Sequence, residues 1–423
     1  MLKNESIKAY WFLPSNPSNK IPGIVTFTPK EEILLELMGT FDKENKILIE
    51  EKKSRYFPII VGKDSEGKYI SLIYCYRRNY SIHHKADFNL SSYAVRNILF
   101  YIGLDSIDSK VFTKASFSLN LLYQWIGRRI LEENIFYDTN DSIDGFQFTF
   151  RKSDQNSPLK VRLSETVFIE IVPYTWFSNA QNAETKISET YKVRIESNSP
   201  LSFEEFRLMV IKFHSFIDLG FGDQVFFTYL NLEVDKSSTT FNKKHPWAKV
   251  LFSQPNVDHD LFRSMKVKFD FALIESNINE IIKNWFSYDT MIEPLISQLI
   301  SINKSSTNLN VDFLTVSQSL DGFHRRFFSK RQKNYVNRLN ELNDFCQNVK
   351  SLNFDLEEIN RIAQNRHYYT HLHLDHDMTY LYAEEELFQK TMKLKTLFYC
   401  CIMKKMGFSD DMLSRVIDVY YYI

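Results

Sequence analysis

The chain has 423 residues but few glycines, prolines and cysteines, with 11, 11 and 4 of them. This scarcity excludes a collagen-like protein and leaves little material for long disordered linkers. The cysteines lack CxxC spacing, and the adjacent Cys400 and Cys401 cannot easily bridge to each other, so the sequence indicates neither a zinc knuckle nor a disulfide framework. We therefore expect reduced thiols in an intracellular, cytoplasmic protein.

The sequence also lacks an excess of either charge, since 52 Lys and Arg balance 52 Asp and Glu. No positive field over the whole protein draws it to nucleic acid or anionic lipid, so any polyanion site must be local. The first residues, MLKNESIKAYWFLP, contain no long apolar core, so we expect no secretory signal, and apolar stretches such as residues 397–403 are far shorter than the roughly 18 residues that a membrane span requires. With 44% hydrophobic residues, the composition is that of a soluble, packed protein without a membrane partner.

The first part of the chain is predicted to be β-sheet. Short apolar or alternating runs, separated by Pro, Gly, Asp and Asn, are typical of antiparallel strands. They cover residues 21–27, 33–37, 46–50, 56–62, 68–74, 110–119, 146–151, 160–163, 166–172, 191–195 and 224–232. A helix interrupts them after Ser202, because Ser-Phe-Glu-Glu resembles a capping box and an apolar run at helical spacing follows from Phe206. We expect a β-rich domain, sandwich or barrel-like, over residues 1–268.

From about residue 271 the apolar period changes to that of helices. One helix is marked by isoleucines at 274–282 and a second by apolar residues at 291–302. The next apolar residues are spaced four, three, four and three, which places them on one helix face: Leu309, Phe313, Val316, Leu320 and Phe323. Further helices are predicted at 334–349, 355–372, 379–406 and 409–423, with Gly407 as a C-cap. The fold class is α+β, with an antiparallel helical bundle over residues 269–423.

Four of the ten histidines fall within ten residues, at His367, His371, His373 and His376. Since His367 and His371 are four apart, their rings share one helix face and could ligate a divalent ion, with Asp375, His373 or His376 as further ligands. No HExxH glutamate accompanies them, and no second cluster is obvious elsewhere in the chain. A metal site and a solvated polar helix end are both open interpretations.

Arg366 and His371 offer a third interpretation, which is RNA cleavage without a metal or another cofactor. The ribose 2′-hydroxyl can attack its own phosphate if one group removes its proton, another protonates the leaving oxygen and a fixed cation stabilises the negative charge. Histidine, with a pKa near 6.5, suits either proton transfer, and arginine suits the phosphate. Five residues separate the two by about 140° around a helix, so a long side chain or a second copy of the helix must bring them together.

The segment Arg366-His-Tyr-Tyr-Thr-His371 resembles the R-x(4–6)-H motif of the HEPN superfamily. The helix that contains Leu-Asp-Gly-Phe-His-Arg at 320–325 and the segment RHYYTHL at 366–372 are similar to the HEPN domain of ApeA-like antiphage proteins. The stretches WFLP at 11–14, IPG at 21–23 and LELMG at 35–39, with Pro29, resemble the opening of the β-rich domain of the same family.

The resemblance implies an abortive-infection endoribonuclease that cuts RNA, specifically tRNA, as a homodimer or higher oligomer. Arg366 and His371 are then the catalytic pair, and His367 stands where the family usually has another polar residue, often Asn. A phage-encoded trigger or inhibitor is a further implied partner. The alternative is that the HEPN bundle is a non-catalytic dimerisation module, with the β-rich domain as the recognition part.

Neighbouring residues complete the predicted site. Asn365 precedes the pair and Tyr369 lies between its two members. Asp321 could orient Arg366 or a histidine by a charge-assisted hydrogen bond, or it could be a solvated carboxylate. Tyr368 and Tyr369 could stack on RNA bases or pack in the core.

A basic run without an acid follows the helix of Phe313, and could hold the phosphate backbone or form a solvated loop. Its cations are Arg325, Arg326, Lys330, Arg331 and Lys333. The β-rich domain carries no glycine-rich phosphate loop or GxSxG elbow, so recognition of an invader component or restraint of the nuclease is its expected role.

Overall fold

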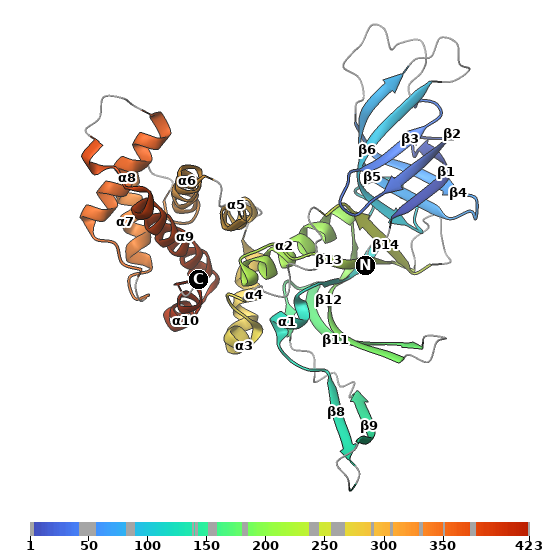
Figure 1. The fold of residues 1–423 in the computed structure, drawn as a ribbon. Coiled ribbons are helices and arrows are strands. Elements are labelled where there is room, and N and C mark those ends of the chain that lie inside the picture. Colours follow the sequence, from blue (N-terminus) through green and yellow to red (C-terminus); the bar gives the residue numbers. More distant parts are fainter. Residues whose placement is uncertain are drawn as a thin grey trace. The chain divides into compact units, whose positions relative to one another are not determined.

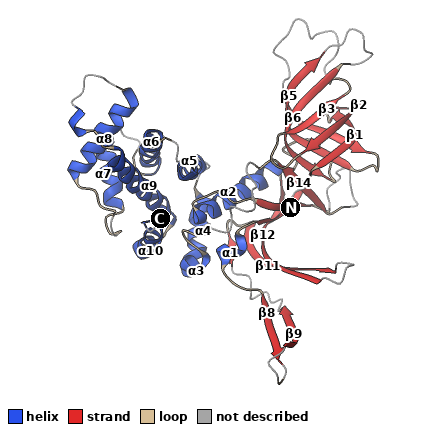
Figure 2. Ribbon diagram, viewed as in Figure 1, coloured by secondary structure: helices blue, strands red, loops and turns tan. Residues whose placement is uncertain are grey.

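In the computed structural model, the chain forms two compact units (Figures 1 and 2). The first comprises Met1–Tyr123, Arg128–Ile211 and Phe226–Ser264, and the second comprises Gln124–Gly127, Lys212–Val225 and Met265–Ile423. The structure describes residues 4–41, 56–81, 89–137, 139, 143–150, 159–179, 185–236, 245–254, 267–288, 292–304, 308–329, 333–349, 352–372 and 378–421. Strands form most of the first unit and helices form the second (Figure 2).

Six antiparallel strands of the first unit close a barrel, in the order β6-β3-β2-β1-β4-β5 and back to β6. They are β1 (Glu5–Leu13), β2 (Asn16–Phe27), β3 (Ile33–Leu37), β4 (Tyr56–Asp64), β5 (Tyr69–Ser81) and β6 (Leu90–Phe100). The barrel core is apolar and includes the fully buried Trp11, Phe27 and Tyr93. Gly62 of β4 lies against the indole of Trp11, and a side chain there would overlap the ring. The expected barrel-like, β-rich region is confirmed.

The sheet continues beyond the barrel through β14 (Trp247–Phe252), which pairs with residues 97–99 of β6. The order then runs β13 (Phe227–Val234), β7 (Phe112–Leu119), β12 (Thr185–Leu201), β11 (Val167–Asn179) and β10 (Leu159–Arg162). A separate hairpin joins β8 (Leu131–Tyr137) to β9 (Ile143–Phe150). The sequence prediction omitted β1, β6, β8 and β14, and its strand at 46–50 lies outside the described residues.

Helix α2 (Phe203–Phe221) follows the last residues of β12, and its start is the predicted capping box. The Ser202 N–H donates to the Glu205 carboxylate at 2.7 Å, and the Glu205 N–H donates to the Ser202 hydroxyl at 3.2 Å. Phe206, Val210 and Phe213 form its buried face. The short α1 (Leu122–Ile126) precedes the β8–β9 hairpin.

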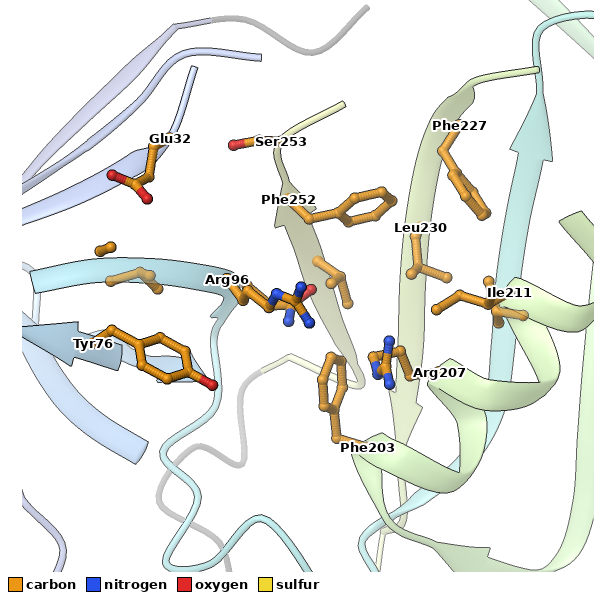
Figure 3. Close-up of a pocket in the computed structure, with 15 residues that line it drawn as sticks. Glu32, Tyr76, Arg96, Phe203, Arg207, Ile211, Phe227, Leu230, Phe252 and Ser253 are labelled. Carbon is orange, nitrogen blue, oxygen red and sulfur yellow. The ribbon is translucent and has the colours of Figure 1, made fainter. Parts of the chain in front are cut away.

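A cavity of 560 Å³ lies in the first unit between α2, β6, β13 and β14 (Figure 3). Phe203, Phe252 and Leu230 form much of its apolar wall, and the guanidinium groups of Arg96 and Arg207 enter it from β6 and α2. Arg207 is held by two hydrogen bonds to the neighbouring Glu204 carboxylate. The cavity therefore combines an apolar wall with at least one cation that is already paired.

The second unit is helical and centres on α9. Its helices are α3 (Phe271–Ile274), α4 (Ile278–Ser287), α5 (Glu293–Lys304), α6 (Leu309–Phe327), α7 (Tyr335–Phe345), α8 (Leu356–His371), α9 (Glu384–Met406) and α10 (Asp410–Tyr421). Helix α9 contacts α4, α6, α7 and α10, and its residues 394–403 are all buried. The predicted stripe of α6 is confirmed at Phe313, Val316, Leu320 and Phe323, which are fully buried.

Two helix predictions are corrected in this unit. The helix expected across 274–282 is divided by a 3₁₀ turn at Glu275–Asn277, and the helix expected from 379 begins at Glu384 after a 3₁₀ turn at Met378–Tyr380. Gly407 ends α9 with φ 102°, a left-handed conformation that favours glycine, as predicted. All four cysteines are buried and free.

Candidate active site

Helix α8 carries the predicted catalytic pair in its last two turns. Asp355 caps its N-terminus by accepting a hydrogen bond from the Glu358 N–H at 2.7 Å. The helix ends at Leu372, whose φ of 50° lies in the left-handed region that non-glycine residues seldom adopt. His371 is therefore the last helical residue, and its imidazole stands exposed at the end of α8.

His367 and His371 are both exposed, one turn apart on α8, and their ring centroids are separated by 4.8 Å. This confirms that the two rings share one face of the helix. His373, Asp375 and His376, the other ligands considered for a metal, lie outside the described residues. In the part of the chain that the structure describes, no group of three or more His, Cys, Asp or Glu side chains is placed to hold a metal ion.

Arg366 leaves α8 in another direction and lies over the ring of Tyr335 from α7, with 4.5 Å between the guanidinium carbon and the ring centroid. The negative face of a tyrosine ring attracts a cation in this position. Burial raises the pKa of Tyr335 to about 12, so its phenol stays protonated at neutral pH. The buried Nε of Arg366 has no hydrogen-bond partner, and no carboxylate among the described residues forms an ion pair with this guanidinium. It is therefore available to an anion.

Asn365, immediately before Arg366, is completely buried and makes three hydrogen bonds. Its amide nitrogen donates to the carbonyls of Arg361 at 2.9 Å and Tyr380 at 3.0 Å, and its amide oxygen accepts from the Tyr382 N–H at 3.0 Å. The last turns of α8 are thereby attached to the segment that leads into α9. The role that the geometry supports for Asn365 is positioning of the catalytic helix.

Asp321 of α6 is bound by two arginines. Its carboxylate accepts hydrogen bonds from Arg338 of α7 at 2.5 Å and from Arg325 at 3.1 Å. Arg338 is 3% exposed and the Asp321 side chain 14%, so the pair is largely withdrawn from water. Arg338 is thus the partner of Asp321 in the structure, where the sequence suggested Arg366 or a histidine. Nothing in the local sequence indicated this pair, since its members are 17 residues apart.

Tyr369 packs where α8 meets α6. Its ring meets the fully buried Phe313 edge-on at 5.9 Å and the ring of Tyr368 at 5.2 Å. Burial raises the pKa of the Tyr369 phenol. Of the two interpretations considered for this residue, stacking on RNA bases and packing in the core, the contacts of Tyr369 fit packing in the core.

The basic run is partly neutralised by carboxylates from outside it. Arg325 binds Asp321, as described above, and Lys333 forms an ion pair with Glu341 of α7. The same Glu341 accepts a hydrogen bond at 2.6 Å from the fully buried His324. Arg326 is exposed, whereas Lys330 and Arg331 lie outside the described residues. The described part of the run therefore has a weaker positive field than its sequence indicates.

No helix among the described residues combines the length and apolar character that a membrane crossing requires.

Two family models together match most of the chain. The model described as ApeA N-terminal domain 1 matches residues 6–285, and the model described as Apea-like HEPN matches residues 297–412. The second match includes α8 with Arg366 and His371. No curated protein and no solved structure gives a significant match.

Proposed function

The chain belongs to the family of ApeA-like proteins with a C-terminal HEPN domain, and from this premise we propose that it is an antiphage endoribonuclease. HEPN domains are generally ribonucleases, and membership of this family points to an antiphage nuclease. The finer parts of the proposal are that the substrate is RNA, specifically tRNA, that cleavage needs no metal, and that Arg366 and His371 carry it out.

One observation carries this proposal, which is the state of Arg366. The guanidinium of Arg366 lies over Tyr335, and its buried Nε lacks a hydrogen-bond partner. A buried donor without a partner destabilises the protein, and a bound anion would remove that penalty. A phosphate offers two oxygens that the planar guanidinium of arginine can bind at once. His367 and His371 supply titratable groups on the same two turns of helix.

In the proposed reaction the ribose 2′-oxygen attacks the adjacent phosphorus, and the bond from phosphorus to the 5′-oxygen breaks. His371 acts as general base on the 2′-hydroxyl or as general acid on the 5′-oxygen. His367 either positions the phosphate or shares the proton transfers. Arg366 stabilises the charge that develops on the phosphate oxygens. The products are a 5′-hydroxyl and a 2′,3′-cyclic phosphate, or a 3′-phosphate where water then opens the cyclic ester.

We propose that the working site needs two copies of the chain. Arg366 lies on the Tyr335 side of α8, whereas the ring of His371 lies beside that of His367. Five residues turn the helix by about 140°, so one copy presents the two groups in different directions. A second HEPN domain across a two-fold axis would place the histidine of one copy near the arginine of the other.

The proposed setting is the cytoplasm, with a phage-encoded trigger or inhibitor as partner. Four buried, free cysteine thiols fit a reducing compartment. We propose residues 1–268 as the sensor or regulatory domain and residues 269–423 as the nuclease domain.

The test is cleavage of tRNA by the purified full-length protein in the presence of EDTA. Wild-type protein should cleave, and Arg366→Ala and His371→Ala should each reduce the rate by about 10²-fold or more, since each removes a proton transfer or the charge on the phosphate. Gln364→Ala is the matched control, because this side chain is exposed on the same helix. Its rate should equal that of the wild type.

Three results would contradict the proposal. Wild-type rates in both variants would remove these residues from the mechanism. Loss of cleavage on chelation, with stoichiometric metal in the untreated protein, would favour the metal site. Absence of cleavage in a protein that still dimerises would favour the non-catalytic module.

A further inference from the structure

The sheet that extends beyond the barrel has two different faces. Alternate residues of β12 and β7 point into the core and are fully buried, among them Val193, Ile195 and Ala115. The residues between them, including Lys192 and Arg194, point to the opposite face, because successive side chains of a strand alternate. We call this second face, formed by β10, β11, β12, β7 and β13, the open face.

The open face carries cations and aromatic rings side by side. Its cations are Lys114, Lys160, Arg162, Lys192 and Arg194, its aromatic residues are Phe168, Tyr174, Trp176 and Tyr229, and its acids are Glu170, Glu196 and Glu233. Trp176 is 50% exposed and Tyr174 37%. Lys114 lies 3.0 Å from Glu196 and 3.2 Å from Glu233, which places two of the acids around one cation. Positive charge is therefore in excess over β10, β11 and β12.

Lys192 and Arg194 are the centre of that excess. The ammonium of Lys192 lies over the ring of Tyr174, 3.0 Å from its centroid, and 5.8 Å from that of Tyr229. Within the described residues neither cation forms an ion pair, although Glu170 is the cross-strand neighbour of Arg194. Burial, followed by the charge of Arg194, lowers the pKa of Lys192 to about 8. Two like charges in a partly buried place, neither with an ion-pair partner among the described residues, are stabilised by a bound anion.

We propose that the open face binds a segment of single-stranded RNA, with phosphates at Lys192 and Arg194 and bases stacked on Tyr174 and Trp176. The choice of RNA rests on the proposed ribonuclease function. Exposed aromatic rings on a sheet bind unpaired bases by stacking, and neighbouring cations bind the backbone. An acidic protein segment would use the cations but leaves the two exposed rings without a role.

The test measures binding of a 2′-O-methyl RNA oligonucleotide to the full-length protein by fluorescence anisotropy. This RNA lacks the attacking hydroxyl, so binding is read without cleavage. Lys192→Glu with Arg194→Glu should weaken binding at least tenfold and reduce the salt dependence by about 1.4 in the log–log slope, for two lost phosphate contacts. Tyr174→Ala with Trp176→Ala should weaken binding about 30-fold or more with an unchanged slope, since each lost stacking contact costs about 1–3 kcal/mol.

Two controls keep the result specific. Lys20→Glu makes the same change of charge at an exposed position of β2 and should leave affinity within twofold. The gentler Lys192→Gln with Arg194→Gln removes both charges without adding new ones, and should still weaken binding if circular dichroism shows intact folding. Unchanged affinity in this folded variant would overturn the proposal, as would an equal loss in Lys20→Glu.

The two proposals fail separately. If the protein binds the 2′-O-methyl RNA through the open face but never cleaves tRNA, the RNA-binding surface stands and the proposed nuclease activity is contradicted. If the protein cleaves tRNA and its RNA affinity does not change with any of the four open-face substitutions, the nuclease activity stands and the RNA-binding surface is contradicted. The latter result would leave an acidic protein as the occupant of the face.

Discussion

Asn365→Ala should destabilise the helical unit strongly, although the residue is polar and carries no charge. The substitution removes all three hydrogen bonds of a side chain that is completely buried. The Tyr380 carbonyl keeps a bond from Arg361 at 2.9 Å, but the Tyr382 N–H is left without its acceptor in a residue that is 6% exposed. An unsatisfied buried donor and the lost bonds together cost about 2–4 kcal/mol.

Thermal unfolding followed by circular dichroism measures this effect. A loss of that size should lower the melting temperature by roughly 4–16 °C, since 1 kcal/mol corresponds to about 2–4 °C in a domain of 150–250 residues. Asn360→Ala is the matched control, because Asn360 is exposed on the same helix and should change stability by less than about 0.5 kcal/mol. Equal melting temperatures for the two variants would refute the argument that Asn365 anchors the end of α8.

Other predictions concern ion pairs and caps. Arg338→Ala should lower the free energy of unfolding, measured in urea, by about 3–5 kcal/mol, because it leaves Asp321 without its buried partner. Arg325→Ala removes an exposed partner and should lower it by less than about 1 kcal/mol. Similar losses in the two variants would contradict the conclusion that Arg338 is the main partner of Asp321. Ser202→Ala should cost about 1 kcal/mol through loss of the capping box. Hydrogen bonding by Arg207 lowers the pKa of Glu204 in the folded protein. The ionised Glu204 carboxylate therefore stabilises the fold above the pKa that it has in the unfolded chain, and this stabilisation is lost as the pH falls through its pKa in the folded protein. Glu204→Gln should therefore be less stable than wild type at pH 7, with a gap that narrows by pH 3; a constant gap would exclude this linkage.

The sequence predicted the helices better than the strands. The stripe of α6 has one apolar period and one buried face, so spacing alone identified it. Strand β6 shows no alternation, because residues 93–95 and 97–99 are buried at consecutive positions. Strand β8 is exposed along nearly its whole length, so it also lacks the half-buried pattern, and its pairing with β9 defines it.

The sequence was enough to predict which residues carry the chemistry of the candidate site, but not which residues they contact. The motif of Arg366 and His371 is local in sequence, and the spacing of His367 and His371 was enough to place their rings on one face. The partners of these residues come from elsewhere in the chain. Tyr335, which lies under Arg366, belongs to α7, and no local pattern distinguishes it from other tyrosines. The burial of Asn365 likewise depends on Tyr380 and Tyr382, which lie 15 and 17 residues later in the chain.

Strand β6 is flanked on both sides along its length. It pairs with β5 on one side, and on the other with β3 at residues 91–95 and then with β14 at residues 97–99. It cannot detach without breaking two ladders at once. Its amides should therefore exchange with deuterium last in the first unit, and barrel and extension should melt as one cooperative body. A displacement of β14 would reach the barrel through its main-chain hydrogen bonds to β6 and through Leu251, whose side chain belongs to the barrel core.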